Sequence, residues 1–313
     1  MVLLLELHDV DDLLDMHAAI EATQAAFAQQ GNRHVLSQPP TMLRAPQGYF
    51  RSVVGGLLES KLLGTRLGAA GGFHGGSTLA ALFELETGRL VALMPYPFGA
   101  LRTAATVAVA TMFLARADAH VVGLLGAGRS AMTLLEGTMC VRDIREVKVY
   151  SPNTRQEFAR RARAELGLDV RACDGPTDVV RGSDVLLVVT NSRQPVFGAA
   201  DVESGLHVGS MGQPHELAVD VYRRADLVIV GDRSQELELG MGVTHPLAEL
   251  DPDDSIWRRT VELGDVVAGR AGRKDREQIT VFRESQGGWG DVALAEWALA
   301  RAKERGLGRE VDL

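Results

Sequence analysis

The sequence predicts an α/β protein: a Rossmann-type, doubly wound parallel sheet preceded by a smaller α+β region. Three observations predict this fold. From Ala119 onward, near-continuous apolar strands alternate with helices, which is typical of a parallel sheet covered on both faces. A glycine-rich turn at residues 126–131 joins the first of these strands to its helix. The first third of the chain instead contains short extended segments typical of a meander.

The first third is predicted to be a meander of strands with a helix at each end. The helix that Gly31 is placed to end has apolar residues at helical spacing. The strands are expected at residues 2–7, 41–45, 50–57 and 62–69, and in a hairpin that turns at residues 86–88. The helices are expected at residues 11–29 and 99–116.

The remainder is predicted to contain the parallel sheet. After the strand that begins at Ala119, further strands are expected at residues 146–150, 168–173, 184–189, 207–210, 226–230 and 279–282. Helices are expected between them at residues 130–142, 154–166, 176–182 and 216–225, and later at 234–240, 246–250, 255–269 and 291–305. Gly167 is placed to stop the second of these helices.

Composition excludes several classes of protein. The 313 residues include 41 acidic and 33 basic ones, and a net charge of -8 argues against general binding to nucleic acid or membrane surfaces. With 46% apolar residues, the chain has ordinary globular composition. Two cysteines, Cys140 and Cys173, are neither a disulfide framework nor a metal site. The start lacks a basic n-region and no apolar run reaches about 18 residues, so we expect a cytoplasmic protein.

The glycine-rich turn predicts binding of a dinucleotide. It reads Gly126-Ala127-Gly128-Arg129-Ser130-Ala131 and lies between an apolar strand and a helix. Gly126 permits the tight turn, Gly128 lets the backbone approach a diphosphate, and Ala131 allows close packing of helix and strand. The helix N-terminus then offers N–H groups and a positive dipole to the diphosphate.

The residues after the second strand favour NADP(H), with NAD(H) left open. NAD sites usually carry an acidic residue there for the ribose hydroxyls. This chain has no acid before Glu157; the hydroxyls of Ser151 and Thr154, the amide of Asn153 and the guanidinium of Arg155 suit a 2′-phosphate better. The alternative is that Ser151 and Thr154 only cap the next helix.

The chain resembles the ornithine cyclodeaminase/μ-crystallin family over nearly its whole length. The resemblance is carried by LRTAA at 101–105, VVGLLGAGRSA at 121–131, VYSPN at 149–153, QPV at 194–196, Glu216-Leu217, and the tail from 269 to 308. It implies a discontinuous substrate and dimerisation domain (1–116 with 290–313), a Rossmann domain (117–289) and a homodimer. Members of the family interconvert amino acids, imines and keto acids with a nicotinamide cofactor; some cyclise ornithine, and one branch serves as a binding or lens protein.

The resemblance assigns three arginines to the substrate. Arg102 matches an arginine that contacts the substrate carboxylate, and Arg44 aligns more loosely with a second one; guanidinium forks bind carboxylates in a bidentate way. Arg66 stands where many members have a lysine. Because arginine stays charged, Arg66 would polarise a carbonyl or imine but would be a poor proton shuttle. The alternative equivalent of that lysine is Lys61. Arg102 could instead form a surface or interdomain ion pair, and the looser match of Arg44 could likewise have no role in binding.

The second departure from the family is in the loop after the fifth strand. Cyclodeaminases carry an acidic proton acceptor there, and this chain has none before Glu216. His215 is the nearby group whose ordinary pKa suits acid–base work, and His74 in the first domain is a second candidate. The alternatives are that His215 is simply an exposed loop histidine and that His74 is a structural one. The missing acid favours plain reduction over cyclodeamination.

The tail after the last strand also departs from the family, reading ESQGGWGD at 284–291. Gln286 or Trp289 is a candidate to reach the substrate, and Asp291 is expected to be the N-cap of the last helix. The cofactor-binding prediction is completed by residues outside the glycine loop: Thr103, Thr190, Asn191, Ser192, Met211 and Gly212.

Together these features predict an NAD(P)-dependent oxidoreductase acting on a small amino acid, imine or keto acid. The catalytic set is Arg66, His215 and His74, and the substrate set is Arg44, Arg66, Arg102 and Gln286. Two alternatives remain: an ammonia lyase of the cyclodeaminase type that uses His215 or Glu216, and an NADPH-dependent binder without catalysis. No metal is expected.

Overall fold

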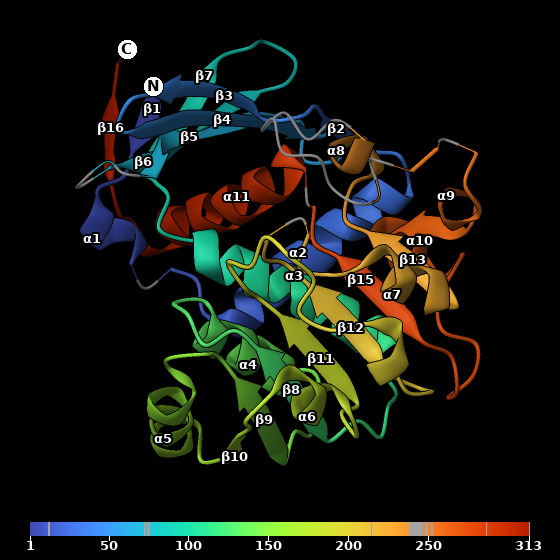
Figure 1. The fold of residues 1–313 in the computed structure, drawn as a ribbon. Coiled ribbons are helices and arrows are strands. Elements are labelled where there is room, and N and C mark those ends of the chain that lie inside the picture. Colours follow the sequence, from blue (N-terminus) through green and yellow to red (C-terminus); the bar gives the residue numbers. More distant parts are fainter. Residues whose placement is uncertain are drawn as a thin grey trace. The chain divides into compact units, whose positions relative to one another are not determined.

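The computed structural model describes residues 1–11, 13–71, 73, 76–213, 215–237, 247, 250–251, 253–285 and 287–312. The chain forms two compact units. The first comprises Met1–Arg102, Ser234–Val243 and Gln286–Leu313, and the second comprises Thr103–Arg233 and Thr244–Ser285. The first is therefore discontinuous in sequence, and each unit has its own sheet (Figure 1).

The first unit is built on an eight-stranded, mainly antiparallel sheet. The strands run in the order β16-β1-β7-β6-β5-β4-β2, with β3 paired to β4, and β1 is parallel to β7. Their bounds are β1 Val2–Leu4, β2 Val35–Ser37, β3 Thr41–Ala45, β4 Gly48–Leu57, β5 Leu62–Gly71, β6 Thr78–Glu84, β7 Leu90–Pro95 and β16 Arg309–Val311. The predicted meander is confirmed.

Helices α2 (Met16–Gly31) and α11 (Gly288–Arg305) cover one face of this sheet, and a short α1 (Leu7–Val10) precedes them (Figure 1). The first turn of α11 lies backbone against backbone on β4. A Cβ on Gly55 would overlap the main chain of Trp289, and one on Gly288 would overlap that of Val54. Trp289 then packs edge-on against Phe27, with ring centroids 4.9 Å apart. Glycine at both positions lets the helix sit directly on the strand.

The second unit is built on an eight-stranded parallel sheet in the order β10-β9-β8-β11-β12-β15-β13-β14. The strands are β8 Val121–Leu125, β9 Glu146–Tyr150, β10 Asp169–Ala172, β11 Val185–Val188, β12 His207–Ser210, β13 Leu227–Val230, β14 Thr260–Glu262 and β15 Thr280–Arg283. The helices are α3 Gly99–Leu114, which begins in the first unit, α4 Ala131–Met139, α5 Arg155–Leu166, α6 Pro176–Val180, α7 Val219–Arg224, α8 Arg233–Leu237, α9 Ser255–Arg259 and α10 Leu263–Val267, with a 3-10 turn at Ala199–Asp201. The predicted fold class is confirmed.

Several predicted elements are wrong in their bounds or type. The strand expected at residues 2–7 ends at Leu4, and the short helix α1 begins at Leu7. The first long helix begins at Met16, because the Asp15 carboxylate accepts the N–H of Ala18 as its N-cap. The predicted helix at 255–269 is two short helices separated by β14, which pairs with β13. Asp291 is not an N-cap: α11 begins three residues earlier, with Gly287 as its N-cap.

The predicted domain boundaries differ in detail from the two units. α3, which we placed wholly in the first domain, groups with the second unit from Thr103 onward. Of the predicted helix at 246–250, residues 246, 248 and 249 lie outside the described residues. The division into independently folding domains stays a prediction.

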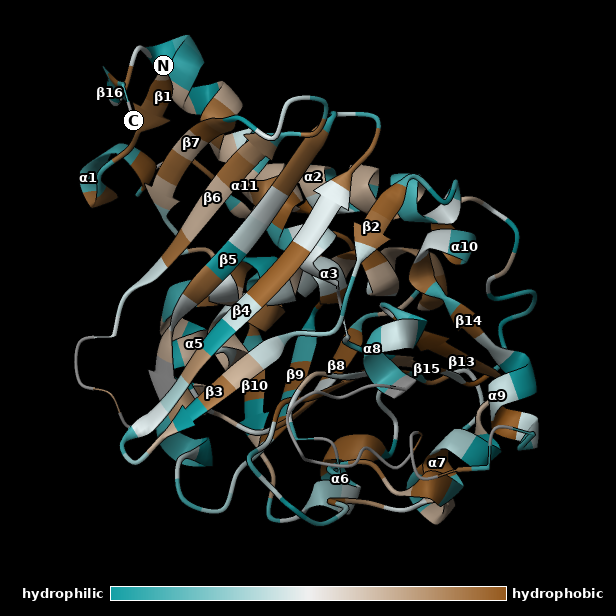
Figure 2. Ribbon diagram, turned by 90° about the horizontal axis from the view of Figure 1, so that it is seen from above, coloured by the Kyte–Doolittle hydropathy of each residue, from teal (hydrophilic) through white to brown (hydrophobic). Residues whose placement is uncertain are grey.

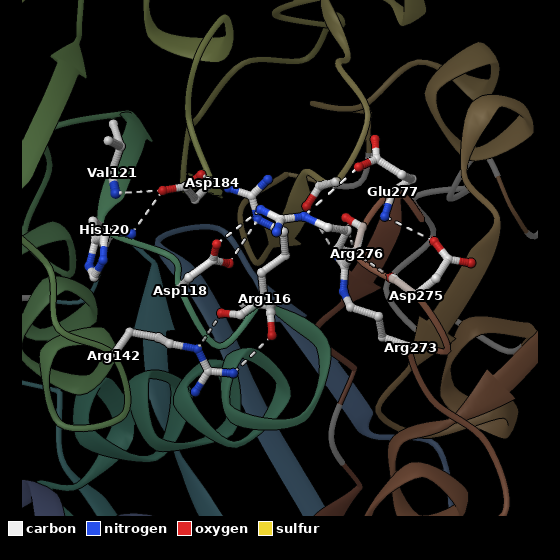
Figure 3. A network of polar contacts seen from close by, with 12 residues as sticks. Arg116, Asp118, His120, Val121, Arg142, Asp184, Arg273, Asp275, Arg276 and Glu277 are labelled. Atoms are coloured by element: carbon white, nitrogen blue, oxygen red, sulfur yellow. Dashed lines mark hydrogen bonds and ion pairs between the residues drawn. The ribbon is translucent and has the colours of Figure 1, made fainter.

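A polar network ties the end of α3 to the starts of two strands of the second unit (Figure 3). Asp184, just before β11, accepts the backbone N–H groups of His120 and Val121 at 2.8 and 2.9 Å, and also pairs with the guanidinium of Arg116. Arg142 donates to the carbonyl of Met112 in the last turn of α3 and to those of Ala115 and Arg116 just after it, at 2.8 to 2.9 Å. These are carbonyls that a helix end leaves without intrahelical partners. The network fixes the start of β8, whose other end carries the glycine-rich turn.

None of the helices described is both long and apolar enough to cross a membrane.

Candidate active site

The glycine-rich turn opens onto a pocket in the second unit. The pocket has a volume of about 570 Å³ and lies where β8, β9 and β11 end. Three segments that are far apart in sequence line it: 125–128, 150–154 and 189–192, together with Pro176 and Val196. Of the residues predicted to bind the cofactor, the pocket is lined by Gly126, Ala127, Gly128, Ser151, Asn153, Thr154, Thr190, Asn191 and Ser192.

The backbone of the turn suits close approach by a ligand. Gly126 has φ +102°, which residues with a side chain rarely adopt, and a Cβ there would overlap the carbonyl of Val189. Its N–H donates to the carbonyl of Tyr150 at 2.9 Å. Gly128 is the opposite case, because a Cβ there would meet nothing within 4 Å. The turn is thus closely packed against β11's end at Gly126, and its backbone is open at Gly128, just before the first turn of α4.

The segment after β9 forms one rim of this pocket. The hydroxyls of Ser151 and Thr154 lie 3.0 Å apart. The Arg155 guanidinium is folded back: it donates to the carbonyl of Pro152 at 3.0 Å and lies 5.7 Å from the centre of the Tyr150 ring. Arg155 therefore supports the rim, whereas Ser151, Asn153 and Thr154 line the pocket itself.

Glu216 holds two loops of this region together. Its carboxylate accepts hydrogen bonds from the N–H and hydroxyl of Thr190, at 2.8 and 3.0 Å, from the Ser210 hydroxyl at 2.9 Å and from the Gly212 N–H at 2.7 Å. Burial raises the pKa of Glu216, although Arg283 and these hydrogen bonds oppose the shift. The side chain is fully buried, so its part is to fix the backbone at Thr190 and Gly212.

A second cluster lies in the first unit around Asp291, whose side chain is 2% exposed. Nε of Arg66 donates to its Oδ2 at 2.9 Å, the Tyr96 hydroxyl donates to its Oδ1 at 2.9 Å, and Nε of Arg102 lies 3.4 Å from Oδ1. Burial by itself would raise the pKa of Asp291, but Arg102, Arg66 and the two hydrogen bonds outweigh it and hold the pKa below the usual value. Burial, followed by the charge of Asp291, raises the pKa of Tyr96.

The cluster brings together two of the three predicted substrate arginines. Arg66 keeps 20% of its side chain accessible and Arg102 keeps 11%. Strand register places Arg44 on the same sheet face as Arg66, where Arg44 is exposed. Arg51, which we did not predict, lies between them on that face. Lys61 lies instead at the β4–β5 turn, paired with Glu86 at 2.7 Å, so of Lys61 and Arg66 it is Arg66 that contacts Asp291.

The remaining predicted residues are scattered. His215 is half-buried in the loop before α7, and Arg129 is exposed at the glycine-rich turn. Thr103 lies in α3, and Met211 follows β12. His74 and Gln286 lie outside the described residues. Within the part of the chain that the structure describes, no group of three or more His, Cys, Asp and Glu side chains is arranged to hold a metal ion.

The sequence analysis took Asp291 for a helix cap and so missed its place in this cluster, and it did not single out Tyr96. Helical spacing holds a signal for Asp291, because it shares a stripe of α11 with Ala295, Ala298 and Ala302, all of which are buried. A charged residue on an apolar stripe must find a partner. Tyr96 carries no comparable signal.

Known proteins resemble the chain over its whole length. The model of the ornithine cyclodeaminase/mu-crystallin family matches residues 2–305. A delta(1)-pyrroline-2-carboxylate reductase of Bacillus cereus is 28% identical over 75% of this chain and 74% of its own. The structure of a probable ornithine cyclodeaminase from Bordetella pertussis superposes with a TM-score of 0.89, at 27% identity, over 99% of this chain and all of that one. That of the Thermococcus litoralis delta(1)-pyrroline-2-carboxylate reductase, in complex with NADH and L-proline, gives 0.86 at 26% identity, over 99% of this chain and all of that one.

Replacement of Glu216 by glutamine tests its role in holding the pocket loops. Each carboxylate oxygen of Glu216 accepts two hydrogen bonds. In glutamine one of these oxygens is replaced by an NH2 group, which cannot accept from the two donors that face it in this buried site. We expect the free energy of unfolding to fall by about 2 kcal/mol or more. Urea denaturation measures it, with Asp220→Asn at the surface of the same unit as the control. An unfolding free energy equal to that of the wild type would contradict this role for Glu216.

Proposed function

The chain belongs to the ornithine cyclodeaminase/mu-crystallin family, and on this premise we propose that it is an NAD(P)-dependent oxidoreductase of a small amino acid, imine or keto acid. The observation that carries the proposal is the pair of arginines, Arg66 and Arg102, held on one buried carboxylate. Such a pair suits the carboxylate that these substrates share. Similarity to reductases of a cyclic imino acid supports the same reaction class.

The residues of the second unit fit a dinucleotide. The diphosphate would lie on the open backbone at Gly128 and the first turn of α4, where the helix dipole and N–H groups favour an anion. Ser151, Asn153 and Thr154 would face the adenosine ribose from the rim after β9. When bound, the nicotinamide supplies the hydride that reduces a C=N or C=O carbon.

The residues of the first unit would bind and polarise the substrate. Arg102 and Arg66 would hold the carboxylate, and the permanent charge of Arg66 would draw electrons from the adjacent C=N or C=O group as hydride adds to its carbon. The exposed Arg44 would contribute a weaker, solvent-screened attraction.

Glu216 argues against the cyclodeaminase alternative. A lyase of that type needs an acidic group free to accept a proton from the substrate amine, and Glu216 was one of our two candidates. Its two oxygens receive four hydrogen bonds from the loops that they hold. His215 is left as the one candidate acid–base group of that loop, and its catalytic role stays a prediction.

The oxidoreductase proposal is tested by following the absorbance of reduced nicotinamide. We expect its consumption with pyruvate plus methylamine or with five- and six-membered cyclic ketimines. Arg102→Gln should lower kcat/KM about 100-fold, because it removes a charged hydrogen-bond donor to the carboxylate. Arg89→Gln, at the surface of the same unit, is the control. Proline and ammonia from ornithine without net cofactor consumption would establish the lyase instead, and tight NADPH binding without turnover over the whole panel would favour the binder.

Cofactor preference is the finer point of the proposal, and NADPH is expected to bind more tightly than NADH. The rim offers two hydroxyls and an amide, with no acid before Glu157. Ser151→Asp would place a carboxylate beside the 2′-phosphate, so the NADPH dissociation constant should rise about tenfold while that of NADH holds or falls. Fluorescence titration measures both. Tighter binding of NADH by the wild type would refute the NADP(H) preference.

We also infer that the chain forms a homodimer through the open face of the first sheet. Figure 2 shows β4 to β6 in front of α11 and α2, which cover the other face. On the open face Leu43 and Phe50 are opposite each other in register and are 72% and 44% exposed. An exposed apolar pair on an uncovered sheet face favours a protein interface. The cytoplasmic location stays a prediction.

Replacing this apolar pair tests the dimer. Leu43→Glu with Phe50→Glu should convert a wild-type dimer into monomers, because four carboxylates would face one another across the interface. Sedimentation equilibrium measures the mass, and Arg89→Gln serves again as the control. A monomeric wild type would refute the homodimer.

A further inference from the structure

The Asp291 cluster contains more positive than negative charges. Two guanidinium groups, of Arg66 and Arg102, meet one carboxylate, and the third partner, Tyr96, is a neutral phenol. Asp291 and Tyr96 are 2% and 4% exposed, so water screens little of the interaction at the carboxylate itself. These four side chains together therefore carry one net positive charge, to which Asp291 contributes the single negative one.

The geometry also fixes where the two cations lie. Each arginine meets Asp291 through Nε, the guanidinium nitrogen nearest the backbone. Arg66 in addition lies over the Tyr96 ring, with Cζ 5.6 Å from the ring centre. The carboxylate comes from α11, Arg66 from β5 and Arg102 from the start of α3, so one side chain joins three elements of the first unit. Without a carboxylate between them, these two partly buried guanidinium groups would repel each other.

We propose that Asp291 is a positioning residue that sets the charge of the substrate site: it holds Arg66 and Arg102 in place and biases the site toward monoanionic carboxylates over dianionic ones. This inference rests on the proposed function, since it takes the two arginines as the carboxylate-binding groups. It assigns a role to a residue that touches the arginines and is not required to touch the substrate. The substrate class that it favours is a keto or imino acid with a single carboxylate at this position.

The test measures the binding of two probes that differ by one charge. Pyruvate and oxalate are similar in size, and isothermal titration calorimetry of the full chain, saturated with the cofactor form that it binds, gives their affinities. Asp291→Asn keeps the shape and an acceptor for Tyr96 but raises the charge of the cluster by one. We expect the ratio of oxalate to pyruvate affinity to rise about tenfold, which corresponds to about 1.4 kcal/mol. Glu296→Gln is the matched control, because Glu296 is an acid of the same helix. Among the described side chains, its carboxylate is bonded by the Ser60 hydroxyl. The affinity ratio of this variant should equal that of the wild type.

A second pair of variants covers the case in which Asp291→Asn does not fold, since removing one member of a buried ion pair is often strongly destabilising. Arg66→Gln alone leaves the cluster neutral and should lower pyruvate affinity at least tenfold. Arg66→Gln combined with Asp291→Asn restores one positive charge, so pyruvate affinity should recover in part. A purely structural role for Asp291 predicts further loss in the double variant.

The outcomes separate the inference from the function on which it rests. A folded Asp291→Asn protein with an unchanged ratio, an equal change in Glu296→Gln, or no recovery in the double variant overturns the inference even if the wild type reduces imines. A wild type that binds neither probe also overturns it. A changed ratio in a protein that reduces no imine or keto acid overturns the oxidoreductase proposal and leaves the charge-setting role of Asp291 standing.

Discussion

The buried carboxylate of Asp291 is the constraint around which the first unit is arranged. A carboxylate that is almost wholly removed from water is tolerated only when cations and hydrogen-bond donors surround it. Arg66, Arg102 and Tyr96 meet this need, and each comes from a different element of the chain. The need for charge compensation thus places two arginines beside each other. Because water screens their charges only in part there, they would attract a ligand carboxylate strongly.

Glycine makes that arrangement possible. Asp291 reaches Arg66 because the first turn of α11 lies directly on β4, and this contact requires hydrogen in place of a side chain at Gly55 and Gly288. The second unit uses the same device at Gly126, whose backbone turns against the carbonyl of Val189, and at Gly212, where a Cβ would overlap the Glu216 carboxylate. In the second unit Glu216 then binds the backbone that glycine has allowed to approach, whereas in the first unit Asp291 binds the side chains of Arg66, Tyr96 and Arg102.

The two anchoring acids explain why this chain departs from part of the sequence-based analysis. Glu216 looked like a substitute for a missing catalytic acid, but its oxygens are occupied by Thr190, Ser210 and Gly212. Asp291 looked like a helix cap, but α11 begins earlier and turns that carboxylate toward the sheet. In each case the sequence analysis noticed the acid but did not identify its partners. For Asp291, the two hydrogen-bond donors lie 195 and 225 residues away in the sequence.

The sequence by itself determined the parallel sheet, the meander, the glycine-rich turn, and the segments 150–154 and 190–192 that line the pocket. These depend on local patterns: apolar strands alternating with helices, and glycine where φ must be positive. Only the tertiary structure decided that residues 260–262 form a strand, because pairing with β13 outweighs their helical pattern. It also decided that Asp291, Tyr96, Arg66 and Arg102 form one cluster. Burial and charge compensation act between residues that the fold brings together, and spacing along the chain does not record them.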